Sequence, residues 1–300
     1  ISVVELTLMA IVPRFTREER LAALGRSMAV YNSVGTTSIV ETHGVAPEVL
    51  QTYRALEEAA GITVRSHLMI SPPWRSAAGH ENLSNALRKH YAGYAGIGSG
   101  DAYLRVGGIF TRVGGSPDAE LRTAAMPYTG WGGFAPDAEV SPDQVRTLVF
   151  EAARLGLRVT TLYPDLLDVF EEANRVAPIS HLRWVISHIR TLDTRQIDRI
   201  RKLGIHVTLQ TNRWIADQGA DLKRQLGPER EHEIVPLRSL SEAGVTFALA
   251  SDNCPPSLFH PIWHCVARYH SGTGEVIAAE QRITREEALR AATINGAALT

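Results

Sequence analysis

Two kinds of hydrophobic pattern alternate along this chain. In some stretches apolar residues recur every three or four positions, which is the spacing of a helix with one buried face. Between them stand short runs rich in β-branched and aromatic residues, which favour buried strands. Thr16 and Thr284 each precede a helical pattern and are followed three residues later by a glutamate, which predicts capping boxes. Glycine closes several helices directly before the next strand, as in AAGITV, RLGLRV, KLGIHV and EAGVTF.

The alternation predicts seven strand–helix units. Strands are expected at residues 36–44, 62–70, 102–110, 157–164, 182–189, 205–212 and 245–252. Helices are expected at residues 16–35, 46–61, 80–96, 141–156, 165–176, 193–204 and 284–298, and a further helical stretch is expected to end at residue 243.

Units of this kind form a parallel sheet with right-handed crossovers. No G-x-G-x-x-G fingerprint follows the first strand, which disfavours a dinucleotide-binding open sheet. We therefore expect an α/β fold of the TIM-type (β/α)₈ barrel class, with residues 1–300 forming a single barrel domain. An open seven-stranded sheet would leave a long unpaired edge. We expect an upstream segment or a partner chain to supply strand one.

Composition narrows the choice of partners. The formal net charge is −1 and no dense block of Lys and Arg occurs, so nucleic acid and a basic membrane surface are not expected as partners. No apolar run reaches the length of a membrane span. Cys254 and Cys265 are the only cysteines, which excludes a disulfide framework. With no recognisable signal peptide, these features favour a cytoplasmic protein that acts on a small molecule, with a homo-oligomer possible.

Candidate chemistry stands where the expected strands end, because a parallel barrel builds its active site at the carboxyl ends of its strands. Four residues of metal-ligand type are read there: His43, His67, His188 and Asp252. His206 instead opens its strand, which places it at the opposite end of the barrel. The spacing alone leaves His188 open to two interpretations, a core histidine or part of a site.

Asp252 also has two interpretations. The apolar run VTFALA leads directly into Ser-Asp and then into a Pro-Pro turn. The aspartate could cap the next helix, an interaction worth roughly 1 kcal/mol. Alternatively, a carboxylate and an imidazole at one barrel mouth suit a divalent ion such as zinc. An aspartate beside a metal-activated water can also act as its general base.

Residues 111–140 form a long irregular segment rich in Gly and Pro. Loops of this length inside a compact chain are usually functional. We expect this loop to cover the strand ends and to bring Arg122 or Tyr128 near the substrate. Asn212, at the end of the strand expected at 205–212, is a third candidate for substrate binding.

Several blocks carry a family resemblance. RWVISHIRTLDTRQIDRIRKLGIHVTLQTN (183–212) resembles the strand-six block of the amidohydrolase superfamily, in the branch of N-substituted formamide deformylases and exoenzyme regulatory proteins. GPEREHEIVPLRSLSEAGVTFALASDNCPP (227–256) is similar to the block around the strand-eight aspartate of that branch. ITREEALRAATINGAAL (283–299) is similar to its last barrel helix, and RVGGIFTRVGGSPDAELRTAAMPYTG (105–130) to its strand-four loop.

The resemblance implies roles for two residues. His188 matches the strand-six metal ligand. Asp252 matches the strand-eight aspartate, which in the family holds the metal and handles the proton of the attacking water. The implied activity is hydrolysis of a C–N, amide-type bond of a small molecule, with a divalent ion, zinc first, as cofactor.

The chain also departs from the family pattern. The resemblance implies that the chain begins after strand one and stops before the flanking β-sandwich segment, so we expect the barrel domain to be incomplete at both ends. No His-x-His pair occurs, Thr161 or Leu162 stands at the position of the strand-five histidine, and Ile109 or Phe110 stands at that of the strand-four lysine. A bridged two-metal centre is therefore not expected. Since catalytic zinc normally has three protein ligands, a one-metal site would draw its third from strand one, our first choice, or from His43 or His67.

Two further functions stay open. A barrel that has lost catalysis could act as a binding or regulatory protein. A metal-dependent lyase or decarboxylase could use the same scaffold, because a fold and a metal do not determine the reaction.

Overall fold

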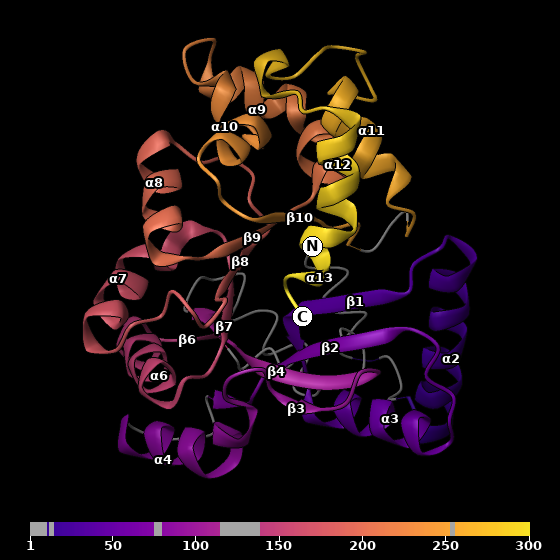
Figure 1. The fold of residues 1–300 in the computed structure, drawn as a ribbon, viewed down its shortest axis with the longest axis vertical. Helices are drawn as coiled ribbons and strands as arrows, with labels where there is room; N and C mark the ends of the chain where they lie inside the picture. Colours follow the sequence, from indigo (N-terminus) through magenta and orange to yellow (C-terminus); the bar gives the residue numbers. More distant parts are fainter. Residues whose placement is uncertain (1–10, 12–14, 75–79, 115–138, 253–255) are drawn as a thin grey trace. The chain divides into compact units, whose positions relative to one another are not determined.

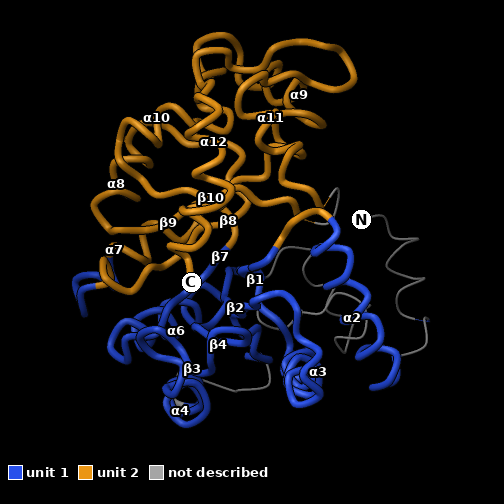
Figure 2. Tube along the Cα trace, turned by 45° about the vertical axis from the view of Figure 1, so that its right-hand side comes forward, with its two compact units in different colours: residues 1–33, 37–161, 172–178 blue, residues 34–36, 162–171, 179–300 orange. Residues whose placement is uncertain are grey.

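The computed structural model describes residues 11, 15–74, 80–114, 139–252 and 256–300. The chain divides into two compact units (Figure 2). Unit 1 contains residues 1–33, 37–161 and 172–178, and unit 2 contains residues 34–36, 162–171 and 179–300. That residues 1–300 form one domain stays a prediction.

Unit 1 is built on parallel strands that follow one another in chain order. They are β1 (Ser38–Val45), β2 (Arg65–Ile70), β4 (Leu104–Phe110) and β7 (Val159–Leu162), and the short β3 (Ser99–Gly100) pairs antiparallel with β4 (Figure 1). The accompanying helices are α2 (Arg17–Ser33), α3 (Pro47–Glu58), α4 (His80–Tyr91), η2 (Ala92–Tyr94) and α6 (Pro142–Leu155). Apolar side chains of α2, α3 and the strands form a buried cluster that includes Met28, Leu50, Leu68 and Val106.

Unit 2 repeats this arrangement with the parallel strands β8 (Val185–Ser187), β9 (His206–Leu209) and β10 (Phe247–Leu249). Its helices are α8 (Thr194–Leu203), α9 (Gly219–Leu226), α10 (Leu237–Glu242), α11 (Phe259–Ala267), α12 (Arg285–Ala292) and α13 (Ile294–Ala297), with the shorter turns η4 (Pro164–Leu166), η6 (Glu231–Glu233) and η7 (Ala279–Gln281). The π-helix η5 (Asn212–Asp217) follows β9 closely. Helix α7 (Leu167–Val176) has residues in both units.

The seven parallel strands are those that the sequence predicts, each followed by helical structure. This confirms the predicted class, a TIM-type barrel that is incomplete. The two-residue strands β3, β5 (Arg112–Val113) and β6 (Glu139–Val140) were not predicted. In the part of the chain described, no helix is long and apolar enough to cross a membrane.

Helix boundaries follow from the capping residues. Thr16 Oγ1 accepts a hydrogen bond from the Glu19 amide and Glu19 Oε2 accepts one from the Thr16 amide, at 3.1 and 2.8 Å, which is the predicted capping box. Gly204 ends α8 with a φ of 65°, and a Cβ there would lie 2.6 Å from the Ser180 carbonyl oxygen. Both the left-handed backbone and the close approach require glycine at this position.

Arg268, at the carboxyl end of α11, is fully buried. Its guanidinium donates to the carbonyl oxygens of Ile277 at 2.6 Å, Ile234 at 2.7 Å and Val235 at 3.1 Å. Burial lowers the pKa of Arg268 to about 10, because the charged form loses its water. The hydrogen bonds of this planar guanidinium therefore connect the end of α11 to the segments around residues 234 and 277.

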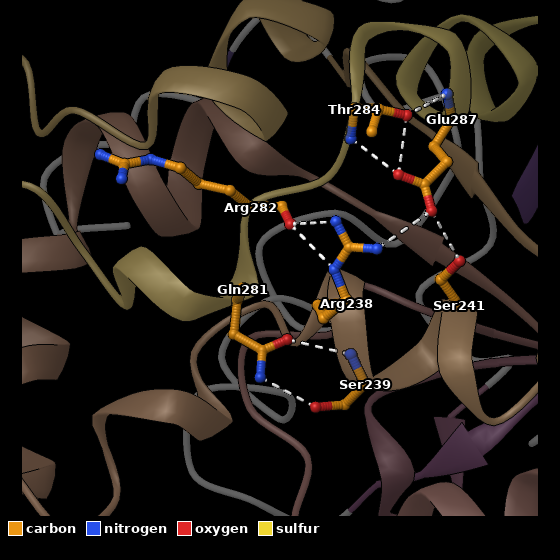
Figure 3. Close-up of polar contacts among 7 residues, drawn as sticks. All are labelled: Arg238, Ser239, Ser241, Gln281, Arg282, Thr284 and Glu287. Atoms are coloured by element: carbon orange, nitrogen blue, oxygen red, sulfur yellow. Dashed lines mark hydrogen bonds and ion pairs between the residues drawn. The ribbon is translucent and has the colours of Figure 1, made fainter.

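A second polar network joins α10 to the start of α12 (Figure 3). Glu287 Oε2 accepts hydrogen bonds from the Thr284 amide and hydroxyl at 2.7 and 2.8 Å, and Glu287 Oε1 accepts from the Ser241 hydroxyl at 3.1 Å and from Arg238 Nη1 at 3.3 Å. Arg238 also donates to the Arg282 carbonyl oxygen. Beside it, the Gln281 amide exchanges hydrogen bonds with the backbone N–H and the hydroxyl of Ser239.

We expect Arg268→Lys to destabilise the protein by about 2–4 kcal/mol, because a single ammonium group cannot donate to all the carbonyl oxygens that the guanidinium contacts. Urea unfolding of both proteins measures this difference. Arg285→Lys on the exposed side of α12 is the matched control and should change the free energy of unfolding by less than about 0.5 kcal/mol. Equal losses in the two variants would contradict the role assigned to Arg268.

We expect Glu287→Gln to lower stability at neutral pH by roughly 1 kcal/mol, because a carboxylate accepts stronger hydrogen bonds than an amide oxygen. The hydrogen bonds from Thr284 lower the pKa of Glu287 below its ordinary value. The carboxylate's contribution is therefore present above the ordinary glutamate pKa, about 4.3, and is lost as the pH falls through the lower folded value.

Thermal unfolding from pH 7 to pH 2.5 should accordingly show the gap between wild type and Glu287→Gln narrowing in acid. Glu286→Gln, at an exposed position in the same turn, reports only the interaction with the helix dipole. A gap that does not change with pH would show that the Glu287 charge is not responsible.

Candidate active site

Three polar side chains follow the parallel strands of unit 2. His188 comes directly after β8, Gln210 directly after β9, and Asp252 three residues after β10. Parallel strands end at the same edge of a sheet, so their terminal residues are brought together. The structure thus places the two predicted ligands, His188 and Asp252, at one edge.

The side chain of Gln210 contacts both of them. Its Nε2 lies 2.8 Å from Asp252 Oδ2 and 3.1 Å from His188 Nε2. An amide nitrogen has two hydrogens and accepts no hydrogen bond, so it donates to both neighbours. His188 Nε2 is therefore the acceptor, and the proton of the neutral imidazole is on Nδ1. The lone pairs of a histidine nitrogen and an aspartate oxygen converge on one point.

The backbone at this edge adopts an uncommon conformation. His188 has a φ of 60°, Asp252 a φ of 56° and Tyr163, just after β7, a φ of 59°. Residues other than glycine seldom occupy this left-handed region, and each such residue costs of order 1–3 kcal/mol. Strain of this kind concentrates where side-chain direction matters more than stability.

Tyr163 supports His188 within unit 2. Its backbone N–H donates to the Ser187 carbonyl oxygen at 2.9 Å. Its ring meets the His188 ring edge to face, with centroids 6.0 Å apart and an interplanar angle of 88°. The imidazole is therefore held by an aromatic ring and by the Gln210 amide.

Asn212 acts on the loop that carries Asp252. Its Nδ2 donates to the Ser251 carbonyl oxygen at 3.4 Å, next to the aspartate in the chain. That Asn212 also binds substrate stays a prediction. Arg122, Tyr128 and most of the loop expected to cover the site lie outside the described residues. At the base of that loop, β5 pairs with β6 and Arg112 forms an ion pair with Glu139 at 3.0 Å.

The other two candidate histidines belong to unit 1. His67 is the third residue of β2 and not its last, so the expected position at the strand end is wrong. Its buried ring lies against Gly107, where a Cβ would overlap Nε2. His43 lies near the end of β1, packs edge to face on Phe110 with centroids 5.1 Å apart, and donates its backbone N–H to Glu41 Oε1 at 2.7 Å.

The side chains of His188 and Asp252 in unit 2 are of the chemical types that bind a divalent ion. A histidine nitrogen and an aspartate oxygen are standard zinc ligands. Within the described ranges, no group of three or more His, Cys, Asp or Glu side chains could hold a metal. His188 and Asp252 therefore account for two of the three protein ligands that a catalytic zinc normally has.

Tyr163 and Gln210 lie near the ends of the strands predicted at residues 157–164 and 205–212, but no role was predicted for either of them. Their position near a strand end was the sequence feature that could have identified them. The bridging hydrogen bonds depend on the strand register and on a buried rotamer, which no sequence pattern reports.

Comparisons with known proteins support the resemblance. A family model described as "Amidohydrolase family" matches residues 3–300. N-substituted formamide deformylase from Arthrobacter pascens is 30% identical over 168 residues, which are 52% of this chain and 30% of that protein. The chain thus spans less than a third of this curated relative.

Among solved structures, an uncharacterized metal-dependent hydrolase from Pyrococcus furiosus matches 95% of this chain and 56% of its own, with a TM-score of 0.67 and 22% identity. Its counterpart from Pyrococcus horikoshii OT3 has the same coverage and TM-score at 18% identity. A triazine hydrolase variant matches with a TM-score of 0.54 and 15% identity, over 95% of this chain and 60% of its own. These likenesses support the barrel fold.

Gly107→Ala tests the placement of His67. The new methyl group would overlap the imidazole, and overpacking of this kind costs about 1–3 kcal/mol. Gly25→Ala in α2, where a Cβ meets nothing within 4 Å, is the matched control. It should be neutral or should stabilise by up to about 1 kcal/mol. Thermal unfolding compares them, and a Gly107→Ala protein as stable as wild type would refute the contact.

Proposed function

The chain belongs to the amidohydrolase family, and on that basis we propose that it is a metal-dependent hydrolase that cleaves a C–N, amide-type bond of a small molecule. The observation that carries the proposal is the convergence of His188 Nε2 and Asp252 Oδ2 on one atom, Gln210 Nε2. The curated relative, named for deformylation of N-substituted formamides, supports the choice of a C–N bond. We propose zinc as the ion, because imidazole and carboxylate donors suit it.

A bound divalent ion supplies a water whose pKa is lowered toward neutrality and which can attack a carbonyl carbon. In this proposal His188 would hold the ion through Nε2, whose lone pair is present in the Nδ1–H tautomer and receives the Gln210 N–H in the ion-free protein. Asp252 has two carboxylate oxygens, so one can hold the ion while the other takes the proton of the attacking water.

Asp252 also completes the reaction. When the C–N bond breaks, the nitrogen leaves with an electron pair and requires a proton. The proton that Asp252 has taken from water is available for that nitrogen, and its return restores the carboxylate. The products are then a carboxylic acid and an amine, and water is the only other reactant.

The remaining assignments stay predictions. They are substrate binding by Arg122, Tyr128 and Asn212, the cytoplasmic location and a possible homo-oligomer.

The test compares His188→Ala and Asp252→Asn with the wild type. Each protein is equilibrated with Zn²⁺, its bound metal is measured by mass spectrometry, and its hydrolysis of a panel of N-substituted formamides and other amides is followed. We expect His188→Ala to lose most of its metal. Asp252→Asn should lose about 10²–10⁴-fold in rate, the usual contribution of a general base.

His181→Ala is the matched control, because His181 is an exposed histidine a few residues before β8. It should keep both the metal and the activity of the wild type. Unchanged metal content and turnover in His188→Ala would show that the ion binds elsewhere and would overturn the proposal.

A further inference from the structure

The amide of Gln210 occupies the point toward which both candidate ligands are directed. Its Nε2 is within hydrogen-bond distance of His188 and Asp252 at the same time. The N–H hydrogens carry partial positive charge, so in the ion-free protein they take the place that a cation would occupy between two electron-pair donors. A cation and this N–H group cannot share that point.

The other end of the same amide has no partner among the described residues. Gln210 is 3% exposed, and its Oε1 is a buried acceptor that receives no hydrogen bond from any described residue. A buried unsatisfied carbonyl is unfavourable and rare. The amide thus places its nitrogen where the ligands converge and leaves its oxygen unused.

We propose that Gln210 is the third protein donor of the divalent ion, through Oε1, and that its amide turns over when the ion binds. The inference rests on the proposed function, because it uses the same ion. Rotation about the last side-chain bond exchanges Oε1 and Nε2 and leaves the rest of the side chain in place. For a side chain this buried, that rotation needs less space than any other movement that turns the N–H hydrogens away from the two ligands.

The charge of the ion determines which way the Gln210 amide is oriented. Without an ion, Oε1 turned inward would face the Asp252 carboxylate, and two oxygen acceptors repel each other. With an ion present, the inward N–H group is repelled by the positive charge, whereas the carbonyl dipole is attracted to it. Each orientation is therefore favoured in one state, and binding shifts the population between them.

The resulting donor set is a histidine nitrogen, an aspartate oxygen and an amide oxygen. Three protein donors leave a coordination position for water, which is the pattern of a catalytic site. Amide oxygens are harder donors than imidazole and suit Mn²⁺ well. Gln210 should therefore contribute to Mn²⁺ affinity at least as much as to Zn²⁺ affinity.

The experiment measures the dissociation constants of Zn²⁺ and Mn²⁺ for the full chain by titration calorimetry. Gln210→Met keeps the length of the side chain and removes the oxygen, and we expect it to bind both ions at least tenfold more weakly. Gln281→Met is the matched control, because Gln281 is a buried glutamine of unit 2 whose amide contacts Ser239 (Figure 3). It should bind both ions as the wild type does.

Equal or tighter binding by Gln210→Met would overturn the inference, since an amide that only blocks the site would improve affinity when removed. A second measurement needs no substitution and covers a variant that fails to fold. In the wild type, the side-chain carbonyl ¹³C signal of Gln210 should shift on saturation with Zn²⁺, as its oxygen gains a partner. An unchanged signal at saturation would equally overturn the inference.

The two proposals fail in different ways. If the wild type binds an ion and His188→Ala abolishes binding while Gln210→Met does not weaken it, only the role of Gln210 is wrong. If binding does not depend on His188, the proposed function fails as well.

Discussion

The direction of the strands is the constraint on which the site depends. Strands that run parallel all have their carboxyl ends at the same edge of the sheet. Each crossover connection therefore brings the last residue of a further strand to that edge. In unit 2 the residues delivered are His188, Gln210 and Asp252. They are 22 and 42 positions apart in sequence, and two hydrogen bonds from one nitrogen join them. The parallel topology brings the three side chains close together, and the Gln210 amide nitrogen is the atom that the other two both contact.

The sequence predicted what depends on local pattern. Apolar periodicity and capping residues located the seven parallel strands and the helices after them, since a capping box such as Thr16 with Glu19 marks the first turn of a helix. The strands themselves are shorter than predicted. Residues 182–189 have strand-like composition throughout, but only Val185–Ser187 pair in the sheet, because the chain turns to left-handed φ at His188.

The site was predictable only in part, for the same reason. His188 and Asp252 could be chosen because a strand directs each of them to the edge, and because their blocks resemble those of a known family. His67 was placed incorrectly, because the strand predicted at residues 62–70 does end at Ile70 and His67 lies inside it, three residues before that end. Gln210 was overlooked because an amide is neither a common metal ligand nor a titratable group, and its importance depends entirely on what lies within 3.1 Å of it.

Arg268 and Gln210 show how differently this fold treats two buried polar groups. The guanidinium of Arg268 is fully enclosed, yet it meets the carbonyl oxygens of Ile277, Ile234 and Val235. Gln210 Nε2 donates two hydrogen bonds, whereas Gln210 Oε1 accepts none from the described residues. The same edge also has positive φ at three non-glycine residues, Tyr163, His188 and Asp252. A fold that satisfies a buried cation with backbone carbonyls alone is able to satisfy an amide oxygen. The proposed role of Gln210 as an ion ligand accounts both for this oxygen, which has no partner among the described residues, and for the strained backbone beside it.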